Sequence, residues 1–104
     1  MKRIGTYLNQ KGEKFTIFLQ DAQVPSDATY WGYFFVVEDS QKRQIPFSAL
    51  IKKDSLSRKQ DADKFVIGDP LNYLQGLLDA TEDGKTPLMG PTTKDWFVMP
   101  GRSR

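Results

Sequence analysis

The feature that most constrains the fold is a run of aromatic and β-branched residues at positions 30–37, YWGYFFVV. This composition is typical of a β-strand, in which successive side chains point to opposite faces. Both faces are apolar: one carries Tyr30, Phe34 and Val36, and the other carries Trp31, Tyr33, Phe35 and Val37. The run therefore predicts a central strand covered on both sides, with Gly32 marking a bulge or a sharp bend.

Alternating segments on either side of this run predict further strands. Residues 2–8 and 14–20 flank the turn sequence NQKG, which favours a β-hairpin. Residues 43–51 predict a half-buried strand. Pro46 lacks an N–H and cannot donate a hydrogen bond to a neighbouring strand, so this strand is expected either at an edge of the sheet or paired through the side away from Pro46. The remaining predicted strands are short, at 64–67 and 96–99. The predicted loops are 21–29, 84–93 and the charged segment 52–63, which could contain a helical turn.

One helix is predicted after Gly68. Asp69 suits the N-cap position and Pro70 the first helical position. An apolar stripe follows at helical spacing, made of Leu71, Leu74, Leu77 and Leu78. We therefore expect a β-rich α+β fold: an antiparallel meander of about five strands, as a curled sheet or a partly open small barrel, with one helix at about 69–80. The chain, 1–104, is the size of a single domain, and 100–104 is expected to be a frayed tail.

The composition excludes several kinds of chemistry. The chain has no cysteine and no histidine, which rules out disulfides, zinc sites built from those residues, and nucleophiles that depend on imidazole or thiolate. Two acidic groups, Asp61 with Asp63 and Asp79 with Glu82 and Asp83, lack the ligand spacing of a calcium loop. We therefore predict no cofactor, no metal and no catalytic residues. The apolar runs are too short to span a bilayer, and no signal peptide is evident, so the cytoplasm is the expected location.

By exclusion, the predicted function is that of a non-catalytic binding module that contacts a larger protein. Aromatic residues and arginine are the side chains most often found at the centre of protein interfaces. The candidate contact residues are Trp31, Tyr33, Arg43, Lys52, Lys53 and Trp96. The aromatic members of this set could instead complete the core of the protein.

An alternative function is the binding of single-stranded nucleic acid. Residues 42–59 carry six basic residues against the single acid Asp54, and they follow the aromatic strand 30–37. Bases stack on aromatic rings while lysine and arginine contact phosphates. The residues in question are Tyr30, Trp31, Tyr33, Lys42, Arg43, Lys52, Lys53, Arg58 and Lys59. A solvated sheet edge protected by lysines would show the same pattern.

Overall fold

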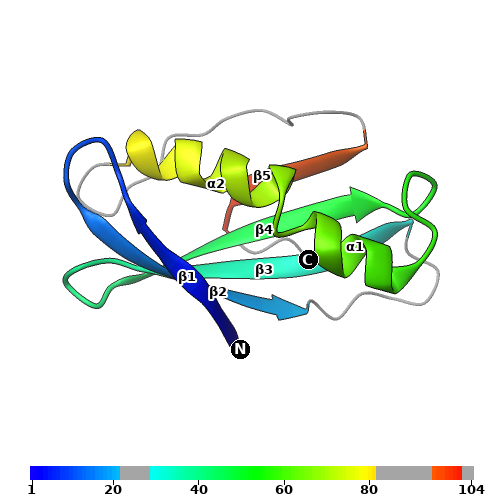
Figure 1. The fold of residues 1–104 in the computed structure, drawn as a ribbon, viewed down its shortest axis with the longest axis horizontal. Coiled ribbons are helices and arrows are strands. Elements are labelled where there is room, and N and C mark those ends of the chain that lie inside the picture. The colour runs from blue at the N-terminus through cyan, green and yellow to red at the C-terminus, as the bar shows by residue number, and fades with distance from the viewer. Residues whose placement is uncertain (22–28, 82–94, 102–104) are drawn as a thin grey trace.

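The computed structural model describes residues 1–21, 29–81 and 95–101, which form one antiparallel sheet and two helices (Figure 1). The strand order follows the sequence, β1-β2-β3-β4-β5, and the sheet stays open. The strands are β1 (Lys2–Leu8), β2 (Lys14–Asp21), β3 (Tyr30–Glu38), β4 (Gln44–Lys52) and β5 (Trp96–Pro100). The helices are α1 (Lys59–Phe65) and α2 (Asp69–Asp79). The predicted β-rich α+β meander is confirmed, as a sheet and not as a barrel.

Strand β3 lies at the centre of the sheet, as its two apolar faces predict. It pairs with β2 on one side and with β4 on the other. The prediction of a bulge at Gly32 is wrong, because the register with β4 continues through the Gly32–Leu50 pair without a shift. The irregularity lies instead in β1, between Arg3 and Gly5. Gly5 has a φ of 154°, which residues with a side chain rarely adopt.

Both helices pack on one face of the sheet, and the core lies between these two layers. The sheet contributes alternate residues of β2 to β5, and the helices contribute apolar residues at helical spacing. The buried cluster consists of Phe15, Ile17, Tyr33, Phe35, Val37, Phe47, Ala49, Ile51, Ala62, Val66, Leu74, Leu77, Leu78 and Val98. Each large side chain buried in this way contributes about 1.5–3 kcal/mol.

The predicted strand at 64–67 is wrong, and the helical turn allowed for in the loop 52–63 is confirmed as the start of helix α1. Helix α1 occupies part of both segments, and its hydrogen bonding continues from the N–H of Val66 to the carbonyl of Ala62. Ala62 and Val66 are fully buried and four residues apart, whereas Ile67 is 49% exposed. The burial pattern thus has the period of a helix. The consecutive residues Phe65, Val66 and Ile67 resemble a strand only in composition.

Helix α2 begins one residue earlier than the predicted cap position implies, because Gly68 and not Asp69 occupies the N-cap position. Pro70 lies in the first turn, as expected, and Leu74, Leu77 and Leu78 form the buried stripe. The carboxylate of Asp79, at the C-terminal end of α2, opposes the helix dipole. It nevertheless accepts hydrogen bonds from Tyr7 Oη at 2.8 Å and from the backbone N–H of Gln10 at 3.1 Å, and so ties the β1–β2 turn to the helix.

Strand β4 is an interior strand, so the alternative that Pro46 places it at an edge is wrong. The pairs between β4 and β5 run from Phe47 to Ile51, and Pro46 lies just outside them. Its carbonyl accepts a hydrogen bond from the N–H of Gly101 at 2.8 Å.

The prediction of a frayed tail at 100–104 is wrong for its first two residues. Pro100 belongs to β5, and Gly101 is hydrogen-bonded to Pro46. Residues 102–104 lie outside the described residues. Most of the predicted loops 21–29 and 84–93 also lie outside them, as do Glu82 and Asp83.

Candidate protein-binding site

Two of the predicted contact residues lie in one row across the sheet. Trp31 of β3 is opposite Ile51 of β4, and Ile51 is opposite Trp96 of β5. All three residues belong to the helix-covered face, and they lie near the end of the sheet where the chain leaves β4 toward α1. The pairing register thus brings together two tryptophans that are far apart in the sequence.

Trp31 fastens the turn after β4 to the sheet. Its indole Nε1 donates a hydrogen bond to the carbonyl of Leu56 at 2.6 Å. The ammonium group of Lys53 lies 4.6 Å from the centroid of the indole ring, a cation–π contact. Both contacts hold the turn that precedes α1 against β3, and they place a cationic side chain beside the row of tryptophans.

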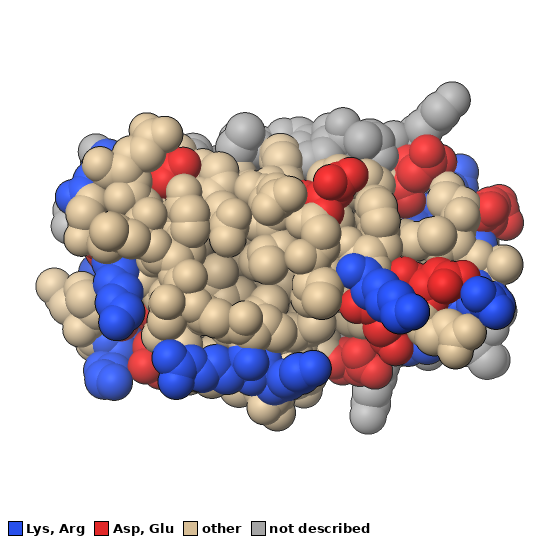
Figure 2. All heavy atoms as spheres, viewed as in Figure 1, with Lys and Arg blue, Asp and Glu red and all other residues tan. Residues whose placement is uncertain are grey.

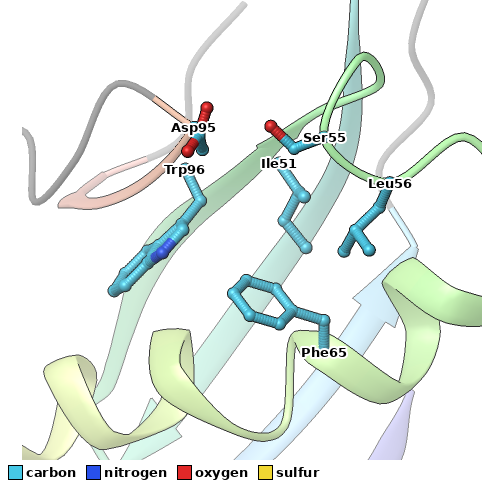
Figure 3. A pocket seen from close by; sticks show the side chains of 6 residues that line it. All are labelled: Ile51, Ser55, Leu56, Phe65, Asp95 and Trp96. Carbon is cyan, nitrogen blue, oxygen red and sulfur yellow. The ribbon is translucent and has the colours of Figure 1, made fainter.

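Trp96 forms one wall of a small apolar pocket. Its ring meets the rings of Phe65 and Tyr73 edge-on, at centroid distances of 6.1 Å and 6.2 Å. Beside these rings is a cavity of about 240 Å³, lined by Ile51, Ser55, Leu56, Phe65, Asp95 and Trp96. In Figure 3, Trp96, Phe65 and Leu56 surround Ile51, while Ser55 and Asp95 lie together at one end of the cavity. We call this cavity the Trp96 pocket.

Tyr33, by contrast, is an interior residue with only 1% of its surface exposed. Its hydroxyl donates to Asp63 at 2.5 Å, and the ammonium of Lys59 lies between Asp63 and Asp21, at 2.5 Å and 3.1 Å from their carboxylates. Burial, together with the hydrogen bond to Asp63, raises the pKa of Tyr33. The same network lowers the pKa of Asp63, chiefly through its hydrogen bond from Lys59. Burial opposes the charge of Lys59, but its bonds to Asp63 and Asp21 leave its pKa raised.

Arg43 lies at the opposite end of β4 from Lys52. The two ends of this nine-residue strand are roughly 25 Å apart, at about 3.3 Å per residue. Arg43 Nε donates at 2.8 Å to Asp39, whose side chain is completely buried. Burial opposes ionisation of Asp39, but hydrogen bonds from Arg43 and from the backbone of Gln41 leave its pKa lowered. Arg43 therefore belongs to the β3–β4 turn and not to the surface near Trp96.

The residues of the nucleic-acid alternative are likewise divided between two ends and two faces of the sheet. Lys42 lies in the β3–β4 turn, 3.5 Å from the carboxylate of Glu38, while Arg58 is paired with Asp61 on α1. Tyr30 is on the face opposite Trp31, where its ring meets that of Phe97 edge-on at 5.7 Å. Of the predicted contact residues, Trp31, Lys52, Lys53 and Trp96 lie at the same end of the sheet, and so does Tyr30, which pairs with Lys52.

Three apolar residues of the pocket, Ile51, Leu56 and Phe65, were not predicted as site residues. The signal that could have located Phe65 is the helical spacing of Ala62 and Val66, which places Phe65 beside a buried helix face. No known protein family matches the chain, and comparison with curated proteins and with solved structures found no match either. Within the described residues, neither helix has the length and apolar character needed to cross a membrane.

Proposed function

We propose that this protein is a non-catalytic binding module that recognises a larger protein through the surface around the Trp96 pocket. The observation that carries the proposal is the pocket itself, a cavity of about 240 Å³ with aromatic and aliphatic walls and polar residues at one end. Protein interfaces concentrate their binding energy where an apolar anchor side chain enters a desolvated pocket of this kind. The cavity is smaller than the range of roughly 300–1,000 Å³ typical of small-molecule sites, so a single side chain of a partner is the better match.

Charged residues next to the pocket would form the rim of the interface. Lys53 is held over Trp31, and Asp95, which lines the cavity, also accepts a backbone hydrogen bond from Lys52 at 2.7 Å. A rim of mixed charge sets orientation and association rate more than affinity. Lys52 pairs with Tyr30, so its side chain lies on the face opposite the pocket. We therefore assign the affinity to Trp96 and the orientation of the partner to Lys53.

The ionisation of the described side chains supports a role without catalysis. A general acid or base works best when its pKa lies near the working pH. Every shift resolved among the described residues moves a pKa away from neutral: it falls for Asp39 and Asp63, and it rises for Tyr7, Tyr33 and Lys59. These interactions keep each group in its ordinary charge state, which suits a structural role.

The test is capture of a partner by the immobilised protein, followed by calorimetry with the purified partner. Trp96→Ala should weaken binding by about 2 kcal/mol or more, or about 30-fold in Kd. Because the loss of Trp96 also removes core contacts, Ser55→Arg serves as a second variant that blocks the pocket from its exposed rim. Ser40→Arg, at an exposed position of the β3–β4 turn, is the matched control. Equal affinities for the Ser55 and Ser40 variants would refute the role of the pocket.

The alternative, binding of single-stranded nucleic acid, is supported by Tyr30, Trp31, Lys52 and Lys53, which share one end of the sheet but lie on its two faces. Labelled oligonucleotides titrated at two salt concentrations test it, because phosphate contacts weaken steeply as salt rises. Absence of binding at low salt removes this alternative. The cytoplasm remains the proposed location, because a chain without cysteine has no need of an oxidising compartment.

A further inference from the structure

A second surface lies on the other side of the molecule, along β1, which is an edge strand. Within the described residues β1 pairs with β2 alone, so one of its sides presents unpaired backbone N–H and C=O groups. The large apolar side chains that are exposed in the described part of the chain are Met1, Leu8 and Ile67, at 69%, 65% and 49%. Met1 and Leu8 lie at the two ends of β1, and Ile67 lines a cavity that β1 also borders.

This cavity, of about 270 Å³, lies where the helix layer stops short of the sheet edge. Its apolar part is formed by Ile4 of β1, Leu19 of β2 and Ile67 between the two helices. Lys2, Asp21 and Asp63 line it as well, and both carboxylates are paired with Lys59. A strand added beside β1 would direct every second side chain toward this face, and an apolar side chain suits the cavity.

The charges on and around β1 select for an acidic partner. The first fourteen residues carry Lys2, Arg3, Lys11 and Lys14 against the single acid Glu13. Arg3 pairs with Phe18, and it therefore lies on the face of the sheet opposite the cavity, where its side chain is exposed. Figure 2 shows a broad uncharged area bordered along its lower edge by a row of lysine and arginine side chains. A second copy of this chain would bring two basic edges together, and like charges disfavour that pairing.

We propose that β1 accepts an extended acidic segment of a partner protein, which adds to the sheet as a sixth strand. The apolar side chains of this segment contact Ile4 and Ile67 on the cavity side. Its acidic side chains lie on the opposite face, near Arg3. The surface is separate from the Trp96 pocket, so the proposal stands on its own observations and goes beyond the function proposed above.

The experiment uses the full chain and a synthetic peptide in which leucine and glutamate alternate. A peptide of the same length with lysine in place of glutamate is the control. Backbone hydrogen exchange followed by NMR should show that the amides of residues 2–8 that face outward become protected when the acidic peptide is added. Arg3→Glu should weaken binding about fivefold to tenfold, because it replaces an attraction with a repulsion. Lys42→Glu, which makes the same charge change in the β3–β4 turn, should leave it unchanged.

Three outcomes would overturn the proposal: equal binding of the acidic and basic peptides, no added protection of the β1 amides at saturation, or protection caused by dimers without peptide. Ser55→Arg, which blocks the Trp96 pocket, should have no effect on peptide binding at β1. Failure at one surface is thereby distinguished from failure at the other.

Discussion

Asn9 offers the sharpest test of how the two layers of this protein are joined. It is 4% exposed and lies in the turn between β1 and β2. Its Oδ1 accepts hydrogen bonds from the backbone N–H groups of Lys11 and Glu13, at 3.0 Å and 2.8 Å. Its Nδ2 donates at 3.1 Å to the carbonyl of Leu78, near the end of α2. One side chain therefore shapes the turn and ties it to the helix.

We expect Asn9→Ala to lower the free energy of unfolding by about 2–4 kcal/mol. Each of the three hydrogen bonds contributes about 0.5–1.5 kcal/mol, and groups left buried without a partner cost more. For a domain of this size, 1 kcal/mol corresponds to about 4–8 °C in the melting temperature, so the loss should be on the order of 10–25 °C. Urea and thermal unfolding followed by circular dichroism would measure both quantities.

Asn72→Ala is the matched control, because it makes the same chemical change at an exposed position on α2. It should be neutral or slightly stabilising, since alanine has the higher helix propensity. Asn9→Asp should fall between the two alanine variants, because it keeps both acceptors for the turn but lacks the donor to Leu78 at neutral pH. If Asn9→Ala lost less than about 1 kcal/mol, the central role of this side chain would be refuted.

Three further predictions concern the core and the ion pairs. Phe35→Ala should cost about 3–5 kcal/mol in chemical denaturation, because Phe35 is fully buried; a loss below that of a surface variant would contradict the proposed core. Tyr33→Phe should cost about 1 kcal/mol and remove the last phase of an alkaline spectrophotometric titration, because burial and Asp63 raise the pKa of Tyr33. Asp39→Asn should flatten the acid dependence of unfolding: the lowered pKa of Asp39 contributes stability above the unfolded value of 3.8, and this is lost as the pH falls through the folded value. An unchanged acid profile would show that Asp39 is not the group responsible.

The strands were predictable from the sequence because their signals are local. Alternation and turn residues lie within a few positions of one another, as in the hairpin of β1 and β2 and in the aromatic strand β3. Helix α1 was not predictable in this way. Phe65, Val66 and Ile67 suit either a strand or the end of a helix, and the contact of Ala62 and Val66 with the sheet decides between them.

The candidate site was predictable only in part. Trp31 and Trp96 were chosen for their residue type, but their nearness depends on how each strand pairs with β4. The same register buries Tyr33 and places Arg43 at the other end of the sheet, where it holds Asp39. Side-chain type therefore indicates which residues could bind a partner, and strand pairing decides which of them meet.

The residue content alone excludes imidazole and thiol chemistry, and the local pattern alone predicts a β-rich meander with an apolar central strand. The folded arrangement alone establishes the Trp96 pocket, the open basic edge of β1, and the pairing of Lys59 with Asp21. The physical reason is range: propensity and alternation act between neighbours in the chain. Cavities, and an ion pair such as Lys59 with Asp21, form between residues that only tertiary packing brings together.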